Sequence, residues 1–349
     1  MVTIKDMAEI LGISTTTVSN VIHGKTSQVS QKTVEKVEKL LEEYEYVPNI
    51  NARNLANNSS RIIGMVIKGR RDRIDNLIAN SFFGDLVSAI EAETRARGYF
   101  MMLYISDDIN ELMRHVSTWN VDGLVMIGIL HDDFARIKSR YKKPAVLIDS
   151  YAPRNVADYV NVGLDDEQAC YDMADYLLEN GHRKIAFLAD NMEGVDYQRY
   201  MGFLRAMHDH GVGTDEDNLI MIHPGILERR SNMREIYEKS KNFTAFMCCS
   251  DYYAAMLISD FTDRGVKIPE EVSFTGFDDD AMSRLVRPKL TTIHQNIREK
   301  GRVAVDCLEK LIRGEELEKK NYTLPVEMVF RDSVKKITEY RRLLNKKDY

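Results

Sequence analysis

Small hydroxyl and amide side chains near the start of the chain have the types and spacing of groups that read DNA. Thr15, Thr16 and Asn20 recur at intervals that place them on one side of a short helix, close to its N-terminal half. The apolar residues of the same segment fall on the other side: Val18, Val21 and Ile22. Side chains that donate and accept hydrogen bonds can contact base edges when such a helix lies in the major groove. The pattern predicts a base-reading helix; an ordinary small helical bundle is the alternative interpretation.

Further helices must hold this helix in place. A preceding helix is predicted by apolar residues at intervals of three and four: Ile4, Met7, Ala8 and Leu11. Gly12 suits the sharp turn between the two helices, and Ser14 is a favourable N-cap for the second. Ser30 is expected to cap a third helix with one apolar stripe: Val34, Val37, Leu40, Leu41 and Tyr44. Pro48 should end that helix, and Asn49 can begin a fourth of about two turns, too short to be stable alone.

Composition limits the class of protein. A chain of 349 residues with 44% hydrophobic and 29% charged residues is expected to form two or three globular domains. We find no apolar run long enough for a membrane span and no secretory signal, so we expect a cytoplasmic protein. The cysteines have no metal-type spacing and are expected to be buried, reduced thiols: Cys170, Cys248, Cys249 and Cys307.

The charge distribution does not by itself favour nucleic acid. The net charge is −6, and residues 1–61 contain seven basic and seven acidic side chains. The acidic residues gather at the end of the expected third helix, which leaves room for a positive side elsewhere. Backbone N–H groups and helix N-termini can also hold phosphates without a formal charge. An ordinary solvated helical surface would have the same composition.

After the polar segment 57–60, the pattern changes to apolar strands that alternate with helix-length segments. The expected strands of a first series are 62–67, 100–104, 123–127 and 145–148. A second series is expected to begin near 159–162 and to continue with 185–189, 219–222, 245–248 and 273–276. Alternating strands and helices predict parallel sheets with right-handed crossovers, and two series predict two doubly wound lobes.

Several motifs in sequence resemble the lactose-repressor (LacI/GalR) family of bacterial transcription regulators. The N-terminal ones are Val-Thr-Ile-Lys-Asp at 2–6, Gly-Ile-Ser at 12–14, Thr-Val-Ser at 17–19, Val-Ser-Gln-Lys-Thr at 29–33, Tyr-Val-Pro-Asn at 46–49 and Ala-Arg-Asn-Leu at 52–55. Later ones are Val-Asp-Gly-Leu-Val at 121–125, Asn-Gly-His-Arg-Lys-Ile at 180–185, and the segments 269–279 and 288–295. The resemblance runs from residue 2 to about 333.

The resemblance implies an all-α helix-turn-helix headpiece followed by an α/β core of two doubly wound parallel-sheet lobes, similar to periplasmic binding proteins. The implied domains are a DNA-binding domain at 1–48, a hinge helix and linker at 49–59, and a core at 60–333. In the core, the first lobe is expected at about 60–159 and 296–326, and the second at about 160–295 and 327–333. Residues 334–349 form a short basic tail.

The resemblance also implies which residues contact double-stranded operator DNA. They are Thr3, Ser14, Thr15, Thr16, Thr17, Ser19, Asn20, His23, Asn49, Ala52, Arg53 and Leu55. Asn20 stands where the best-known member has an arginine, so adenine is favoured over guanine at its base. Leu55 matches the hinge leucine that enters the minor groove, and its helix should become ordered only on DNA.

Effector ligands are expected beyond the carboxyl ends of the strands. The predicted effector-binding residues are Asn80, Phe82, Asp149, Arg199, Ser250, Asp278 and Gln295, of which Arg199, Ser250 and Asp278 are implied by the resemblance to the family. A guanidinium and carboxylates facing each other can bracket a polyol, so a sugar or related polyhydroxy compound is the first choice of effector. A nucleobase or another small metabolite is the alternative. Phe82 could instead be core, Asp149 a cap, and Arg199 and Asp278 members of structural ion pairs.

Two other classes of protein are disfavoured. The acidic run 278–280 and His294 could suggest an enzyme, yet the sequence lacks hydrolase, metalloprotease and phosphate-loop motifs. We therefore predict no catalytic residue, no cofactor and no metal site. A solute-binding protein would share the core fold but not the headpiece.

The prediction is an effector-controlled regulator, a repressor by preference, that binds a near-palindromic operator as a homodimer. Residues 338–349 are too few to join dimers through a coiled coil.

Overall fold

The computed structural model describes residues 2–22, 24–46, 59–69, 77–78, 80–151, 159–223 and 225–337. It divides into two compact units, Met1–Ser60 and Arg61–Tyr349, which we call the headpiece and the core. His23, the predicted hinge residues Asn49, Ala52, Arg53 and Leu55, and the tail 338–349 lie outside the described residues. Within the described residues, no helix is both long and apolar enough to cross a membrane.

The described part of the headpiece consists of α1 (Ile4–Leu11), α2 (Thr15–Ile22) and α3 (Gln31–Glu43). Thr3 caps α1 in a reciprocal pair with Asp6, and Gly12 takes the left-handed backbone (φ 63°) that ends it. The three helices bury a shared apolar cluster: Met7, Ala8, Val18, Val21, Val34, Val37 and Leu40. Tyr44, which we predicted on the buried stripe of α3, is exposed because the helix ends at Glu43 and Tyr44 is its C-cap.

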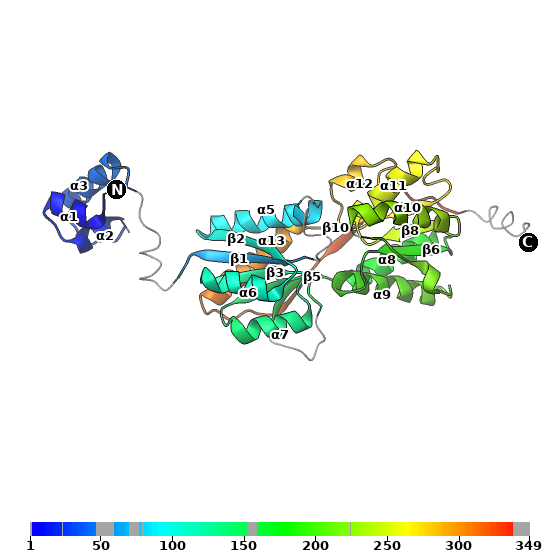
Figure 1. Ribbon diagram of the computed structural model, residues 1–349, viewed down its shortest axis with the longest axis horizontal. Helices are drawn as coiled ribbons and strands as arrows, with labels where there is room; N and C mark the ends of the chain where they lie inside the picture. Colours follow the sequence, from blue (N-terminus) through cyan, green and yellow to red (C-terminus); the bar gives the residue numbers. More distant parts are fainter. Residues whose placement is uncertain are drawn as a thin grey trace, which may run out of the picture. The chain divides into compact units, whose positions relative to one another are not determined.

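The first lobe of the core is built on a six-stranded parallel sheet in the order β11-β5-β4-β3-β1-β2. Its strands are β1 (Ile62–Lys68), β2 (Phe100–Ser106), β3 (Gly123–Ile127), β4 (Ala145–Ile148), β5 (Val160–Leu164) and β11 (Asn321–Leu324). Helices α5 (Ser81–Ala96) and α13 (Ile297–Ile312) cover one face, and α6 (Ile109–Thr118) and α7 (His131–Arg140) cover the other (Figure 1). The central strands are buried throughout because both faces are covered.

The strand β5 corrects one prediction. We expected the second series of strands to begin here, with the lobe boundary near 160. Instead, β5 pairs in parallel with β4 and β11 in the first sheet. The chain enters the second lobe only at α8, whose N-cap is Asp165. An apolar run predicts a buried strand but does not identify the sheet that contains it.

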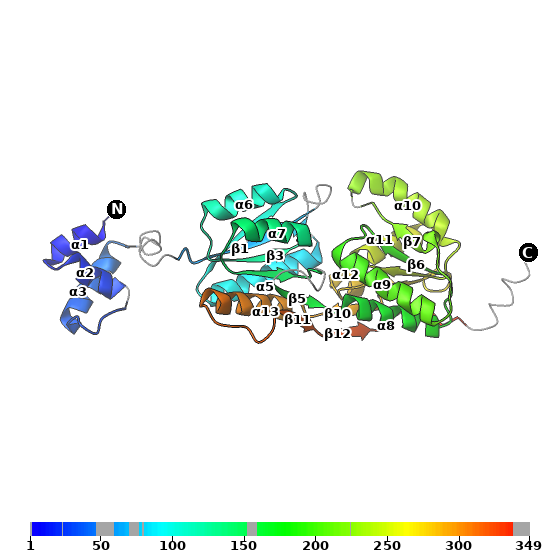
Figure 2. The ribbon, with the colours of Figure 1, turned by 90° about the horizontal axis from the view of Figure 1, so that it is seen from below.

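The second lobe has a four-stranded parallel sheet in the order β7-β6-β8-β9. Its strands are β6 (Ile185–Ala189), β7 (Leu219–Met221), β8 (Ala245–Cys248) and β9 (Ser273–Thr275). Helices α8 (Asp166–Glu179) and α9 (Gly194–Asp209) lie on one face, and α10 (Ile226–Ser240) and α11 (Asp251–Asp263) on the other (Figure 2). The short helices η2 (Glu216–Asn218) and α12 (Ala281–Leu285) complete the described elements of this lobe. All four cysteines are buried thiols.

Three chain segments connect the lobes. The first joins β5 to α8, the second joins β10 (Thr292–Gln295) to α13, and the third joins β11 to β12 (Val326–Val329). The strands β10 and β12 pair with each other in antiparallel register, Gln295 opposite Val326. The residues at the ends of these segments therefore lie where the two lobes meet.

A close approach of α8 and α9 gives a test of the second lobe. A Cβ at Gly202 would lie 2.0 Å from the carbonyl oxygen of Glu167 and 2.9 Å from the backbone nitrogen of Tyr171. We expect Gly202→Ala to lower the free energy of unfolding by about 2–3 kcal/mol, because backbone atoms must move apart. Denaturant unfolding measures this.

Gly213→Ala is the matched control, because a Cβ there meets nothing within 4 Å. It should leave stability nearly unchanged. Equal stability of the two variants would contradict the packing of α8 on α9.

Candidate effector site and DNA-contacting helix

The helix α2 presents the side chains predicted to read DNA. Thr15 and Thr16 are exposed, while Thr17, Ser19 and Asn20 are half-buried. Ser14 caps the helix, because its Oγ accepts a hydrogen bond from the backbone nitrogen of Thr17 at 3.1 Å. Thr3 Oγ1 donates to Asp6 Oδ2 at 2.8 Å. Thr3 and Ser14 thus have a structural role in addition to the predicted one, whereas Thr15 and Thr16 face solvent.

Arg199 is the central cation of the second lobe at the lobe junction. It extends from α9, is 6% exposed, and its Nε donates to Asp166 Oδ1 at 2.8 Å. Its Nη1 donates to the carbonyl oxygen of Cys249 at 2.5 Å, and its guanidinium lies 3.4 Å from the centroid of the Phe277 ring. The fixed fork of donors is thereby held by a carboxylate, a carbonyl and an aromatic face.

Asp278 follows β9 and faces Arg199 in the buried junction. Its backbone has φ 114°, and its nitrogen donates to the carbonyl oxygen of Ile293 on β10 at 2.8 Å. Its Oδ1 accepts a hydrogen bond from Gln295 Nε2 at 2.6 Å. Burial raises the pKa of Asp278 to about 7, although the Arg199 charge and the Gln295 amide favour the ionised form.

The first lobe contributes Asp149, directly after β4, with φ 51°. Both of its carboxylate oxygens accept hydrogen bonds from Lys300 Nζ at 2.8 Å. The same ammonium donates to Gln295 Oε1 at 2.6 Å and lies 5.6 Å from the centroid of the Phe82 ring. Burial raises the pKa of the Asp149 carboxyl, and the Lys300 charge opposes this rise.

These contacts form a polar network at the lobe junction that consists of two hydrogen-bonded groups. One contains Asp149, Lys300, Gln295 and Asp278, the other contains Arg199 and Asp166, and the Arg199 charge acts on both Asp149 and Asp278. Gln295 joins the two halves, because its oxygen accepts from Lys300 and its nitrogen donates to Asp278. Tyr151, after β4, donates its hydroxyl to Asp166, which also accepts from Arg199. The structure therefore brings together five predicted effector residues, Phe82, Asp149, Arg199, Asp278 and Gln295.

Three members of the network were not predicted from the sequence, Tyr151, Asp166 and Lys300. Asp166 and Lys300 lie in the first turn of a helix, where a charged residue normally faces solvent. Lys300 is nevertheless fully buried, on the side of α13 that packs on the sheet with Ala304 and Leu308. A lysine at an apolar position of a periodic helix was the available signal.

Asn80 and Ser250, also predicted to bind effector, are not part of the network. Asn80 Oδ1 accepts from the backbone nitrogen of Phe82 at 3.1 Å and caps α5. Ser250 Oγ accepts from the backbone nitrogen of Tyr253 at 3.4 Å and caps α11. Their side-chain oxygens satisfy helix N-termini, which is the commonest use of such residues before a helix.

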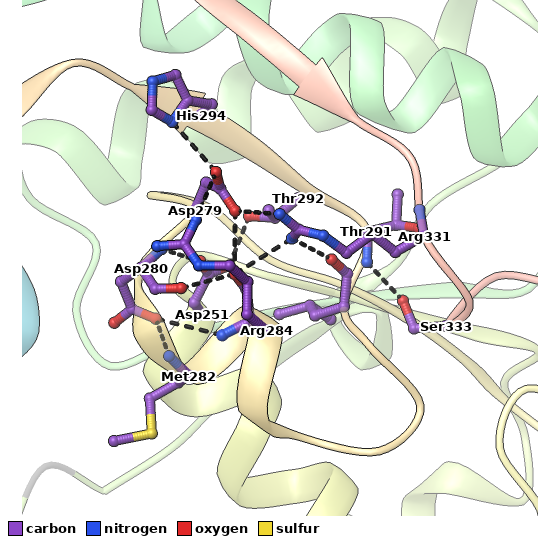
Figure 3. Close-up of polar contacts among 12 residues, drawn as sticks. Asp251, Asp279, Asp280, Met282, Arg284, Thr291, Thr292, His294, Arg331 and Ser333 are labelled. Atoms are coloured by element: carbon purple, nitrogen blue, oxygen red, sulfur yellow. Dashed lines mark hydrogen bonds and ion pairs between the residues drawn. The ribbon is translucent and has the colours of Figure 1, made fainter.

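The acidic residues beside Asp278 anchor the connecting segments (Figure 3). Asp279 accepts from Ser283 Oγ and Arg284 Nη1 at 3.1 Å each and from Arg331, and His294 Nδ1 lies 3.2 Å from it. Asp251 accepts from Thr292 Oγ1 at 2.5 Å and from the backbone nitrogen of Asp280 at 2.9 Å. Among the described residues, no group of three or more His, Cys, Asp or Glu side chains could hold a metal ion.

A helix-turn-helix headpiece and a two-lobed α/β core with a buried polar network at the lobe junction define the class of ligand-responsive DNA-binding regulators. Residues 3–49 match the family "Bacterial regulatory proteins, lacI family", and residues 174–334 match the "Periplasmic binding protein-like domain". The chain belongs to the LacI family of bacterial regulatory proteins, as its motifs predicted, and is a DNA-binding transcription regulator rather than an enzyme.

Relatives and solved structures agree with this assignment over the whole chain. The chain is 34% identical to the HTH-type transcriptional repressor PurR of Vibrio parahaemolyticus, over 97% of this chain and 100% of that protein. It is 31% identical to PurR of Mannheimia succiniciproducens, with the same coverage. The Lac repressor dimer bound to operator and the anti-inducer ONPF superposes with a TM-score of 0.83, 25% identity, and coverage of 96% and 99%. The predicted fold class is thereby confirmed.

The raised pKa of Asp278 predicts a dependence of stability on pH. Because the folded pKa is about 7 and an unfolded aspartate titrates near 4, the folded state binds more protons between these values. The contribution of Asp278 to stability is thus present below about pH 4 and is lost as the pH rises through 7. The Asp278→Asn variant has no carboxyl to lose a proton, so this loss is absent. The unfolding temperature of the variant minus that of the parent should therefore increase as the pH is raised from 5 to 8.

Differential scanning fluorimetry at several pH values measures this difference. Asp263→Asn, at an exposed position at the end of α11, is the control and should follow the parent throughout. A constant difference between Asp278→Asn and the parent from pH 5 to 8 would rule out the perturbed carboxyl.

Proposed function

We propose that this protein is a transcriptional repressor whose affinity for operator DNA is set by a small effector bound at the lobe junction. One observation supports the effector site: five of the residues predicted from sequence, drawn from both lobes and from β10, lie together at the lobe junction, where two buried cations hold them. Effector groups that replace hydrogen bonds of this network would change how the lobes are held together. Coupling of roughly 1–3 kcal/mol between effector and DNA is sufficient for regulation, and it must be reciprocal.

On the DNA side, Thr15, Thr16 and Asn20 of α2 are proposed to contact base edges, with Thr17, Ser19 and the caps Thr3 and Ser14 placing the helix on the backbone. Two half-sites of a near-palindrome require two headpieces, so we propose a homodimer that acts in the cytoplasm. The Lac repressor structure at TM-score 0.83 is a dimer on its operator, which supports this proposal. The proposed hinge contacts of Asn49, Ala52, Arg53 and Leu55 rest on the family resemblance.

A nucleobase is the effector class that we now favour over a sugar. Asp149 and Arg199, which the sugar prediction relied on, are already paired with buried partners: Asp149 accepts from Lys300, and Arg199 donates to Asp166. Asp278 and Gln295 are bonded to each other through Oδ1 and one amide N–H, so the second carboxyl oxygen and the second amide N–H are an acceptor beside a donor, which suits the edge of a planar base. The relatives at 31–34% identity are named PurR, which supports a nucleobase-type effector. A sugar remains the second candidate because the junction is rich in carboxylates.

A ligand screen on the free protein tests the effector class. We expect one or more of adenine, guanine, hypoxanthine, uracil and cytosine to raise the unfolding temperature by about 2–4 °C at a concentration well above its Kd. Asp278→Asn should lose most of that shift. Ribose, glucose and galactose serve as the opposing panel, and a response to a sugar with none to any base would reverse the preference.

Asn20→Ala tests the base-reading role of α2. Loss of the amide should weaken operator binding by about 1–3 kcal/mol, and the loss should be confined to one base pair of each half-site. Fluorescence anisotropy with operator variants measures this. Tyr44→Phe, a neutral change at the exposed C-cap of α3, is the control. If Asn20→Ala bound every operator variant as tightly as the parent, the assignment would fail.

A further inference from the structure

The contacts of a single ammonium group stand out in the core. Three residues that the sequence predicted to hold the effector, Phe82, Asp149 and Gln295, all contact Lys300 Nζ. They come from α5, from the end of β4 and from β10, and the cation lies at the point where they meet. The contacts are a carboxylate at 2.8 Å, an amide oxygen at 2.6 Å and an aromatic ring at 5.6 Å.

The position of Lys300 is unfavourable for a charge unless these partners hold it there. The residue is 0% exposed and lies in the first turn of α13, where the helix dipole repels cations. A buried ammonium without partners would lose its proton or unfold the site. Asp149, Gln295 and Phe82 therefore stabilise the charge, and Lys300 in turn satisfies the acceptors that they present.

The second lobe contains an equivalent arrangement. Arg199 lies 3.4 Å from the centroid of the Phe277 ring and donates to Asp166. Each lobe thus supplies a buried cation, an aromatic ring and a carboxylate, and Gln295 with Asp278 connects the two halves. The difference is that the Lys300 ammonium ends a flexible four-carbon chain with rotatable donors, whereas the Arg199 guanidinium is a planar fork with fixed donor directions.

We propose that Lys300 is a built-in occupant of the first-lobe half of the effector site. Its ammonium contacts the Asp149 carboxylate, the Gln295 amide oxygen and the Phe82 ring face, which an effector would otherwise contact. An effector group that enters the first-lobe half of the site must therefore displace the ammonium or accept a hydrogen bond from it. The location of the effector site rests on the proposed function, but the occupancy of these three groups by a cation does not. Lys300 is accordingly a residue that determines effector specificity, because it lowers the affinity for ligands whose hydrogen-bond donors would compete for Asp149.

Chemical rescue tests this without effector or operator. Lys300→Ala removes the three outer methylenes and the ammonium, which together correspond to n-propylammonium. We expect n-propylammonium chloride to raise the unfolding temperature of Lys300→Ala by about 2–4 °C at saturation. Potassium chloride at equal ionic strength and neutral n-propanol should have no such effect. The parent, and Lys300→Ala combined with Asp149→Asn, should not respond to the amine.

A second variant covers the case in which Lys300→Ala does not fold. Lys300→Met keeps the apolar stem and leaves Asp149 buried without its cation, faced by Asp166, Arg199 and the Tyr151 hydroxyl. Its carboxyl must then be protonated in the folded state, so its stability is retained at low pH and lost as the pH rises. The unfolding temperature of Lys300→Met should fall relative to the parent between pH 5.5 and 8, and Asp149→Asn in the same chain should abolish that fall.

The two readouts decide the proposal. A folded Lys300→Ala that is indifferent to n-propylammonium would overturn it, as would a Lys300→Met whose unfolding temperature parallels the parent at every pH. A failed ligand screen with positive rescue would instead refute the proposed effector class and leave the role of the Lys300 cation intact.

Discussion

Two buried cations determine how the lobe junction is built. Arg199 and Lys300 are each almost or wholly removed from water, and each must find a carboxylate, further acceptors and a ring face within reach. The partners come from elements that are far apart in the sequence: the ends of β4 and β10, the segments directly after β8 and β9, and the starts of α5 and α8. These partners must all lie within hydrogen-bond distance of the two cations. Because hydrogen bonds specify distance and direction, this requirement restricts the positions of the strand ends more than apolar packing alone does.

The same constraint limits how a ligand can act. Removing one partner from a buried charge pair costs several times more than the pair contributes, since the remaining charge is left uncompensated. A ligand at the junction must therefore substitute its own groups for those that it displaces. The Gln295 amide oxygen accepts from Lys300, and the amide nitrogen donates to Asp278. A ligand that replaces one of these two partners can therefore reorient the amide and change its contact with the other. In the proposed mechanism, effector binding and lobe arrangement are therefore coupled through that amide.

The sequence predicted the parts of the fold that depend on local patterns. Buried parallel strands have continuous apolar runs, and the caps at Ser14 and Ser30 follow from side chains that satisfy helix N-termini. It did not predict that β5 belongs to the first sheet, because strand propensity is local and sheet membership depends on tertiary pairing. Asp166 and Lys300 were missed for a related reason. A charged residue near a helix start is normally solvated, and only the approach of distant elements buries it. Asn80 and Ser250 show the converse, since their local role as caps already accounts for their side-chain oxygens.

The headpiece and the core face different electrostatic demands. Residues 1–61 contain equal numbers of basic and acidic side chains, so this part of the chain has no net charge. Helix N-termini, backbone N–H groups and base contacts can therefore contribute to DNA binding beside the basic side chains. In the proposed mechanism, a coupling of roughly 1–3 kcal/mol, transmitted from a few hydrogen bonds at the lobe junction, changes the affinity for operator DNA by about five- to 150-fold. Exchange of a few buried contacts at the junction supplies free energy of this size, because each hydrogen bond to a charged group contributes about 1.5–3 kcal/mol.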